Sequence, residues 1–470
     1  MIPVDSYTDI SSLPETVLNQ LEANVKCAVI TPSISSYNEE RRIFNRAIDK
    51  KPAAIVKCTD NAHVIETIRI ARKYNLPVSI RASGHCVAGH ALCDGIVVDL
   101  RLMKEIQLDP TRGTIRCGAG LTWGEFDSET QKFHLATTGG TVSTTGIAGL
   151  TLGGGIGWLM GKYGAACDNL VEAEVILADG ERVIANPDMN SELFWGIRGG
   201  GGNFGVVTSF TYKLNHLGPV LAGSIIYPLR QASDVLRFFR AFTEEASDDL
   251  TCSITLLSNE MGRQLVSFDL CYSGDIDQGY LQIRPLLEMK GFLSNSLRVM
   301  SYCEFQRLYD NPLRAGMYSY WRANYLTAIK DRTIDTIIQQ FSNVPSKNTL
   351  VMVEHFHGAM ARVGPQETAF PNRDASYSVL IICNWLEPSQ SGVNKKWTHD
   401  LYESLAIDSL RRAYVNYLDD EGEDRVRVSY GPLYERLVSL KNKYDPTNFF
   451  RFNHNVRPTV NSSQTEGRIK

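Results

Sequence analysis

The sequence lacks the charge excess and the long apolar runs that mark nucleic-acid-binding and membrane proteins. Lysines and arginines number 48 against 52 aspartates and glutamates, which gives a net charge of −4. So small a charge offers no electrostatic attraction to nucleic acid or to an anionic membrane, and neither is expected as a partner. One apolar stretch, residues 146–160, is rich in glycine and shorter than the roughly 20 residues that a membrane-spanning helix needs.

The sequence also lacks paired cysteines and a leader segment. Its ten cysteines are scattered between Cys27 and Cys383 without a Cys-x-x-Cys pair. This pattern argues against a zinc or disulfide framework, predicts no metal site, and is typical of reduced thiols in the cytosol. The start of the chain contains no basic segment followed by an apolar core, so we expect no signal peptide and a cytoplasmic protein.

What the sequence does contain is a globular composition, with 43% hydrophobic and 21% charged residues. A chain of 470 residues exceeds one hydrophobic core, so two domains are expected. Residues 53–58 and 78–80 are β-branched runs of strand length, and between them Val64, Ile68 and Ala71 recur at helical spacing. This pattern predicts a strand–helix–strand unit that leads directly into residues 81–85.

Glycine is concentrated in three segments, residues 83–89, 139–157 and 199–205. Glycine lets the backbone approach a ligand and present its N–H groups to phosphate oxygens. One such segment is often an ordinary turn, but three within one domain indicate a ligand of dinucleotide size. Gly200, Gly202 and Gly205 have the spacing of a nicotinamide-dinucleotide fingerprint, yet a helical pattern precedes them and a β-type run follows. The fingerprint needs the opposite order, so an NAD-dependent dehydrogenase is not predicted.

The glycine-rich segments resemble those of a known flavoprotein family. Residues 81–85, Arg-Ala-Ser-Gly-His, are similar to the R-S-G-G-H loop of the berberine-bridge-enzyme-like oxidases, which belong to the vanillyl-alcohol-oxidase and p-cresol-methylhydroxylase superfamily. The resemblance continues through residues 138–169 and 193–207, resumes at residues 414–417 and closes with Asp-Pro-Thr-Asn-Phe-Phe at residues 445–450. It covers most of residues 50–215 and 410–458 and is specific for the fold and the cofactor.

The resemblance implies an α+β fold of two domains: a PCMH-type FAD-binding domain and an inserted substrate domain built on an antiparallel sheet. The FAD-binding domain is expected over residues 1–215, with its core at about 48–215, and the substrate domain over residues 216–410. Residues 411–470 are expected to return and complete the FAD domain. Monomer and homodimer are both compatible with the sequence.

The resemblance also implies that the flavin is covalently attached. In the family, the loop histidine is bonded to the flavin 8α-methyl group, and His85 matches it. Many relatives form a second bond from a cysteine in a G-G-x-C-P segment, but here Val142 occupies that position. We therefore expect FAD with a single attachment through His85, as in the hydroxynicotine oxidases that the chain resembles. The other cofactor-binding residues implied by the matching segments are Arg81, Ala82, Ser83, Gly84, Thr141, Thr144, Thr145, Gly146, Gly149, Gly153, Gly154, Gly157, Asp168, Asn169, Gly205, Val206, Tyr414 and Asn416.

A tyrosine is the expected catalytic base. Oxidation beside the flavin needs a group within hydrogen-bond reach that takes a proton from the substrate. In the related cannabinoid-forming synthases this is the tyrosine that closes a Y-x-N-Y element, which Tyr417 matches. The alternative is a packed tyrosine whose hydroxyl is bonded to its neighbours. Other relatives use a glutamate seven residues before a strand-ending tryptophan. Counted from Trp385, that position is Ser378, so a glutamate mechanism is not expected here.

The strand expected over residues 351–357 is predicted to lie over the flavin. Alternation puts Val353, His355 and His357 on one face, with Glu354 and Phe356 on the other. His355 aligns with a substrate-contacting tyrosine of the same synthases. It is therefore a candidate catalytic residue, a structural role being the alternative. Val353 and His357, on the same face, are candidate substrate contacts.

A second strand, expected over residues 377–385, supplies further candidate substrate contacts. Ser378, Leu380, Ile382 and Asn384 share one of its faces. If this face looks inward, Leu380 and Ile382 contact the substrate in a largely apolar pocket. Such a pocket favours an aromatic, alkaloid-like or polyketide-like substrate over a sugar.

The acceptor of the electrons is expected to be O2. In relatives, a small side chain three positions after the attachment cysteine admits oxygen to the flavin, and Thr145 at that position is close to valine in size. We therefore predict an oxidase that removes two electrons from a C–N, C–O or activated C–H bond of a small molecule and releases H2O2. The alternatives are an oxidative cyclase of secondary metabolism that uses the same flavin step, a sugar oxidase, a dehydrogenase, or a flavin-binding protein without turnover.

Overall fold

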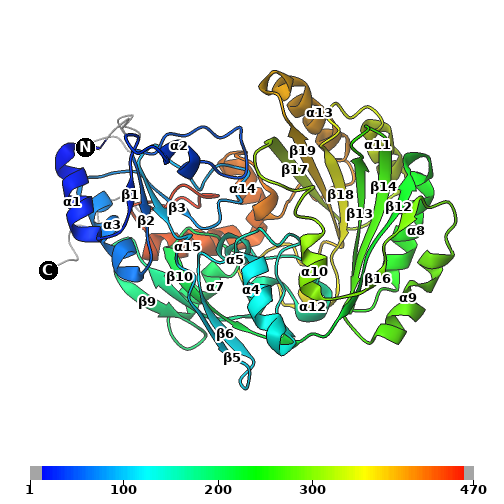
Figure 1. Cartoon of the computed structure of the whole chain (residues 1–470), viewed down its shortest axis with the longest axis horizontal. Coiled ribbons are helices and arrows are strands. Elements are labelled where there is room, and N and C mark those ends of the chain that lie inside the picture. The colour runs from blue at the N-terminus through cyan, green and yellow to red at the C-terminus, as the bar shows by residue number, and fades with distance from the viewer. Residues whose placement is uncertain (1–12, 460–470) are drawn as a thin grey trace.

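The computed structural model describes residues 13–459, which form two lobes (Figure 1). Residues up to about 217 and the C-terminal segment from about 411 make up the first lobe, blue through cyan to green and orange to red in the figure. The intervening residues, green to yellow, make up the second lobe. Residues 1–12, on which much of the expectation of no signal peptide rests, lie outside the described part of the chain. Among the described residues, no helix combines the length and the apolarity needed to cross a membrane.

The first lobe begins with a small mixed sheet of strand order β1-β2-β4-β3. Strands β2 (Ala54–Lys57) and β3 (Val78–Arg81) both pair parallel to β4 (Ile96–Asp99), and α3 (Asn61–Lys73) connects them. The α3 helix buries Val64, Ile68 and Ala71, and it starts where the Asp60 side chain accepts a hydrogen bond from the His63 N–H. The predicted strand–helix–strand unit is therefore confirmed. Strand β1 (Val29–Ile30) pairs antiparallel to β2 at the edge.

A second, antiparallel sheet of order β5-β6-β10-β8-β9 completes the strand framework of this lobe. Its strands are β5 (Ile106–Asp109), β6 (Thr114–Gly118), β8 (Leu170–Ile176), β9 (Arg182–Ala185) and β10 (Val206–Lys213). Helices α4 (Trp123–Thr130), α5 (Ile147–Leu152) and α6 (Met160–Tyr163) lie between β6 and β8 in the chain. Helix α7 (Ser191–Ile197) precedes the third glycine-rich segment and β10 follows it, so the order expected from the sequence is confirmed.

The second lobe is an eight-stranded sheet in which all the pairings are antiparallel. Its strand order is β15-β12-β14-β13-β18-β19-β17, and β16 also pairs with β12. The strands are β12 (Val220–Pro228), β13 (Leu250–Ser258), β14 (Gln264–Tyr272), β15 (Ser294–Asn295), β16 (Arg298–Met300), β17 (Tyr318–Leu326), β18 (Leu350–His355) and β19 (Tyr377–Trp385).

One face of this large sheet is covered by helices. They are α8 (Ala232–Glu244), α9 (Ile276–Glu288), α11 (Asp331–Phe341) and α13 (Ser391–Ser404). Alternate strand residues such as Phe268, Val353 and Ile381 pack with Phe239 and Ile337 of these helices in one buried cluster. The other face of the sheet turns toward the first lobe, where its residues meet the cavity described below (Figure 1).

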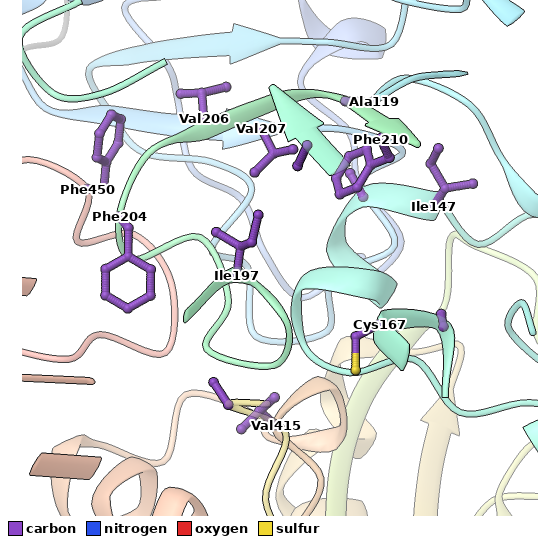
Figure 2. Packing of buried hydrophobic residues seen from close by; sticks show 14 of the residues in the cluster. Ala119, Ile147, Cys167, Ile197, Phe204, Val206, Val207, Phe210, Val415 and Phe450 are labelled. Atoms are coloured by element: carbon purple, nitrogen blue, oxygen red, sulfur yellow. The ribbon is translucent and has the colours of Figure 1, made fainter. Parts of the chain in front are cut away.

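The C-terminal segment returns to the first lobe, as Figure 2 shows for Phe450 beside Phe204 and Val206. It contains α14 (Glu423–Tyr430) and α15 (Tyr434–Tyr444), and α15 packs against α7. The buried Lys441 ammonium lies 2.7 Å from Asp445 Oδ2 and also donates to the carbonyl oxygens of Asn203 and Phe450.

The expected boundary between residues 215 and 216 falls inside β11 (Asn215–His216), which pairs with β7 (Leu135–Ala136) of the first lobe. The structure therefore keeps both residues of this pair in the first lobe, and the other expected borders stay predictions.

Candidate active site

A large cavity lies between the first lobe and the uncovered face of the second-lobe sheet, and we call it the central cavity. Its wall in the first lobe is made by the loop after β3 and by parts of the three glycine-rich segments. Leu313, Trp321, Met352, Leu380 and Ile382 form the wall in the second lobe. The C-terminal segment adds residues 414–418 and Phe450, so segments far apart in the sequence share one site.

His85 stands in the wall of the central cavity at the end of the loop after β3. The Ser83 hydroxyl oxygen accepts hydrogen bonds from the N–H groups of His85 (3.3 Å) and Gly146 (3.0 Å), which joins two glycine-rich segments. The loop turns at Gly84, whose φ of +79° is in the left-handed region that favours glycine. Near these contacts the His85 ring lies 4.3 Å from the Phe44 ring, centroid to centroid.

The His85 imidazole is neutral and partly unbonded. Its Nε2 atom is buried and has no hydrogen-bond partner among the described residues. Burial lowers the pKa of His85 to about 4, because the cationic ring would lose its hydration. At neutral pH the ring therefore keeps a free nitrogen lone pair, which is the form that can act as a nucleophile.

Glycines open the cavity wall at some positions and permit close packing at others. A Cβ atom added at Gly149 or Gly202 would meet no atom within 4 Å, so these residues face open space. A Cβ at Gly153 would collide with the Asn416 side chain, so glycine is needed for the C-terminal segment to approach. Asn416 Nδ2 donates to the Leu150 carbonyl oxygen (3.1 Å), and Tyr414 OH accepts from Gly155 N–H (2.8 Å).

Most residues expected from the sequence to touch cofactor or substrate line the central cavity. They are Ala82, Ser83, Gly84, His85, Thr141, Thr145, Gly146, Gly149, Gly153, Gly205, Val206, Leu380, Ile382, Tyr414, Asn416 and Tyr417.

Six of the expected cofactor-binding residues lie outside the cavity wall: Arg81, Thr144, Gly154, Gly157, Asp168 and Asn169. Most of them contact the neighbouring loops and stabilise the loop conformation. The Arg81 guanidinium turns away and donates to the carbonyl oxygens of Glu40 and Arg42. Asn169 donates to the carbonyl oxygens of Tyr163 and Ala165.

Asp168 is paired with a residue of the second lobe. Both of its carboxylate oxygens accept hydrogen bonds from Arg373, at 2.6 and 2.9 Å, and both side chains are almost fully buried. This bidentate pair joins the two lobes. Gly154 packs under the Phe370 ring and Gly157 under the Gly139 carbonyl, while Thr144 is exposed. These positions therefore shape the loops without facing the cavity.

The prediction for strand β18 had the alternation right and the face wrong. Val353 packs into the core beneath the helices, and Met352 on the opposite face lines the cavity. His355 stacks on His357 (ring centroids 4.3 Å apart) and lies 5.2 Å from Tyr377, on the helix-covered side. Val353, His355 and His357 are therefore not placed to touch a substrate in this cavity. Both faces of the strand carry polar residues, so alternation alone does not identify the inner one.

The inner face of β18 instead carries Glu354, which is hydrogen-bonded to Tyr417. Tyr417 OH donates to Glu354 Oε1 at 2.9 Å. Glu354 is 5% exposed, and burial raises the pKa of its carboxyl group to about 7. Burial also raises the pKa of Tyr417 well above its usual value, and the nearby charge of Glu354 adds to the effect.

The position of Glu354 explains why the sequence did not reveal it. In the register of the sheet, Glu354 on β18 lies directly opposite Ser378 on β19. Ser378 is the residue counted back from Trp385, so the carboxylate stands one strand away from the position at which it was sought. The signal in the sequence that could have pointed to Glu354 was the presence of an ionisable residue directly after the apolar run Leu350 to Val353.

Further cavity residues were also missed. Phe452, Asn453 and His454 begin two positions after the end of the Asp-Pro-Thr-Asn-Phe-Phe element, and His90 follows His85 by five positions. The rings of His90 and His454 meet at 4.9 Å, nearly perpendicular to each other. Extending the matched segments by a few residues would have included them.

Comparison with known proteins identifies the cofactor and the class. Residues 52–186 match the FAD binding domain family, and residues 413–457 match the family described as berberine and berberine like. An FAD-linked oxidoreductase of Bacillus subtilis (strain 168) is 30% identical over 92% of this chain and 96% of its own. The (R)-6-hydroxynicotine oxidase of Paenarthrobacter nicotinovorans is 30% identical over 93% of this chain and 97% of its own.

The fold agrees with these matches. The crystal structure of 6-hydroxy-D-nicotine oxidase from Arthrobacter nicotinovorans superposes with a TM-score of 0.84 at 27% identity, covering 92% of this chain and 98% of that one. The fold and site thus define an FAD-binding oxidoreductase of the two-domain PCMH type. The chain belongs to the berberine-bridge-like family of FAD-linked oxidoreductases. The unpartnered imidazole of His85 and the glycine positions open to the cavity fit an FAD held there.

Proposed function

We propose that the protein is an oxidase that carries FAD on a single covalent bond from His85 and oxidises a small aromatic or alkaloid-like molecule with O2, releasing H2O2. The observation that carries this proposal is the arrangement of the central cavity. A neutral histidine with an unbonded nitrogen stands in one wall, an apolar sheet face forms the other, and Tyr417 lies among the residues that join them.

A single attachment is supported by the thiols around the cavity. Val142, at the position where relatives carry the second attachment, lines the cavity and has no reactive group. Cys86 also lines it, but burial raises the pKa of its thiol, which disfavours the thiolate needed to form a thioether. His85 is therefore the proposed attachment point.

When bound, FAD supplies the chemistry of accepting two electrons and a hydrogen from a substrate and passing them on to O2. The residues of the chain then bind and orient the substrate and take up its proton. Tyr417 is the proposed proton-accepting group because it lines the cavity and carries a hydroxyl group. Thr145, also in the wall, is small enough to leave a path for O2.

The second-lobe wall supports the proposed substrate class. Met352, Leu380 and Ile382 present only apolar surface, which suits an aromatic ring better than a sugar. Trp321 adds one polar group, an indole N–H that is buried and has no hydrogen-bond partner among the described residues. A substrate with a ring and one hydrogen-bond acceptor, such as a hydroxyl or a ring nitrogen, matches this wall. The (R)-6-hydroxynicotine oxidase has by its name a substrate of this kind.

A panel of compounds scored by peroxide release tests the proposal. It should contain 6-hydroxynicotine, benzylisoquinoline amines, aromatic alcohols and mono- and oligosaccharides. We expect an aromatic amine or alcohol to bleach the flavin absorbance without air and to yield H2O2 in air. Activity confined to sugars would contradict the substrate class, and reduction by an aromatic compound without reoxidation in air would contradict O2 as the acceptor.

A further inference from the structure

We propose that Cys27 and Cys58 are a thiol pair that H2O2 oxidises to a reversible disulfide, and that this bond locks strand β1 to the small sheet of the first lobe. The inference goes beyond the proposed function and does not depend on it, because the peroxide can be supplied from outside. Cys27 lies between α1 (Glu15–Val25) and β1, and Cys58 directly follows β2. Nothing in the spacing of the cysteines indicates this pair, because residues 28–57 separate its members.

The two cysteines lie opposite each other across β1 and β2. These strands pair antiparallel, with Val29 opposite Val56, and the same register continued by two residues places the cysteines opposite each other. The Lys57 N–H donates to the Ala28 carbonyl oxygen (2.9 Å), so the intervening pair is hydrogen-bonded and the cysteines occupy the next, non-hydrogen-bonded position. The Cα atoms of such a position are about 4.5 Å apart, a distance that a disulfide can span.

The two thiols also interact directly. A hydrogen bond from the Cys58 side chain lowers the pKa of Cys27 below its usual value, and this effect outweighs the burial of Cys27 and the nearby charge of Asp60. The same contact, together with burial, raises the pKa of Cys58 well above its usual value. Cys27 is therefore the thiol that is biased toward the reactive thiolate, and Cys58 is the protonated thiol beside it.

Exposure assigns the same order to the two residues. Cys27 is partly exposed to solvent, whereas Cys58 is fully buried. Burial raises the pKa of every other described cysteine, so Cys27 is the one described thiol that combines access to solvent with a lowered pKa. Peroxide reacts with the thiolate, and it therefore attacks Cys27 first.

The oxidation consumes one molecule of H2O2 for each disulfide. The Cys27 thiolate attacks one peroxide oxygen, the O–O bond breaks, and a sulfenic acid forms while the departing hydroxide takes up a proton and becomes water. The Cys58 thiol then attacks the Cys27 sulfur, so that the S–O bond breaks, the S–S bond forms and a second water leaves with the thiol proton. Two thiols thus lose two hydrogens and two electrons, and one H2O2 gains them.

The segment between the two cysteines connects the bond to the site. Strand β1 has two residues and lies at the edge of its sheet, where β2 is its strand partner. Residues 28–57 include Phe44, whose ring packs on His85 and whose N–H donates to the Gly84 carbonyl oxygen (3.0 Å). A disulfide closes this segment into a loop and lowers the conformational entropy of the unfolded chain. The oxidised protein should therefore hold the wall beside His85 more firmly.

Peptide mapping of the holoenzyme tests the pair without a substrate. The protein is treated with a small excess of H2O2, its free thiols are alkylated, and it is digested without a reducing agent. We expect a linked peptide pair that contains Cys27 and Cys58 and is lost on reduction with dithiothreitol. In Cys58→Ser the sulfenic acid cannot close the bond, so dimedone should label Cys27 instead.

Cys303 is the matched control. It lies on α10 (Tyr302–Arg307) and is also partly exposed, but burial raises its pKa to about 11. Its thiol should therefore stay reduced and be alkylated under the same conditions. A Cys27 that is oxidised without a link to Cys58, or a Cys303 that is oxidised as readily as Cys27, would overturn the pairing.

Thermal unfolding of oxidised and reduced samples tests the locking of β1. Oxidation should raise the unfolding temperature by about 3–6 °C, and dithiothreitol should reverse the shift. The shift should be absent in Cys27→Ser and kept in Cys303→Ser. Each variant is compared with its own reduced form, so a change in baseline stability does not affect the result. Cys27→Ser alters a partly exposed residue, and it keeps the test valid if Cys58→Ser fails to fold. A linked peptide without any shift in the wild-type protein would overturn the locking.

Discussion

The two walls of the central cavity differ in how they are built. The first-lobe wall consists of loops whose conformation depends on their own residues, such as Gly84 with its positive φ and Ser83 with its two backbone hydrogen bonds. The second-lobe wall is one face of a sheet, and neighbouring residues such as Met352 and Val353 belong to it or not according to what packs behind them. The residues that a loop presents to the cavity can thus be predicted from the local sequence, whereas the residues that a sheet face presents depend on tertiary packing.

The largest effect on stability is expected where the C-terminal segment joins the loop wall. Lys441→Met leaves the fully buried Asp445 without its ion pair, and we expect the free energy of unfolding in urea to fall by about 3–5 kcal/mol. Lys396→Met, which breaks an exposed pair with Asp400, is the matched control and should change it by less than about 0.5 kcal/mol. Equal effects would contradict the importance of burial at this junction.

Adjacent residues of β19 test the two faces of the sheet. Ile381 packs in the helix-covered core, so Ile381→Ala should lower the free energy of unfolding by about 2–5 kcal/mol. Ile382→Ala enlarges the cavity instead, and its main effect should be a raised KM for the best compound of the panel. Urea unfolding and peroxide kinetics on both variants provide the comparison. The reverse pattern would mean that the face has been assigned wrongly.

Two glycines of the same segment should respond differently. Gly153→Ala brings a Cβ against Asn416 and should destabilise the fold by about 1–3 kcal/mol, with part of the loss recovered by Asn416→Ala. Gly149→Ala points into open space, so it should leave the unfolding of the flavin-free protein unchanged while lowering its FAD content. Thermal unfolding and the ratio of flavin to protein absorbance measure both. A stable Gly153→Ala protein would contradict the close approach.

The smallest effect is expected at His355. Its ring stacks on His357 and lies near Tyr377 on the helix-covered side of the sheet, so His355→Gln should leave the rate and pH profile of flavin reduction unchanged. Glu354→Gln, one residue earlier in the strand, is the contrasting variant. A large loss of rate in His355→Gln would restore the catalytic role that the sequence suggested for it.

The sequence therefore predicted the loop wall better than the sheet wall, for physical reasons. Glycines and the residues around His85 act through the local backbone conformation, which depends on neighbouring residues in the sequence. Most of the expected cofactor-binding residues line the cavity, and six do not. The order of α7, the third glycine segment and β10 was likewise readable from periodicity. Arg81 and Asp168 match the family segments by position, but their side chains do not face the cavity. Arg81 contacts the Glu40 carbonyl oxygen and Asp168 contacts Arg373, and both contacts depend on distant parts of the fold.

The sheet wall could not be read in this way. Alternation grouped Val353 with His355 correctly, but which group faces the cavity depends on α8 and α11 packing over the other face. Glu354 was set aside for the same reason, and because a carboxylate was sought on β19 and not on the neighbouring strand. Its bond to Tyr417 joins residues 63 positions apart, a contact that only the folded chain creates.

The attachment of FAD to His85 is the claim on which the proposed reaction depends, and peptide mass spectrometry tests it most directly. The purified protein is precipitated in acid, washed free of unbound flavin and digested with trypsin. We predict a yellow pellet and a mass increase of one FAD on the peptide that contains His85, lost in His85→Ala and retained in Cys86→Ala. A colourless pellet, or an adduct that moves with Cys86 instead, would contradict the account.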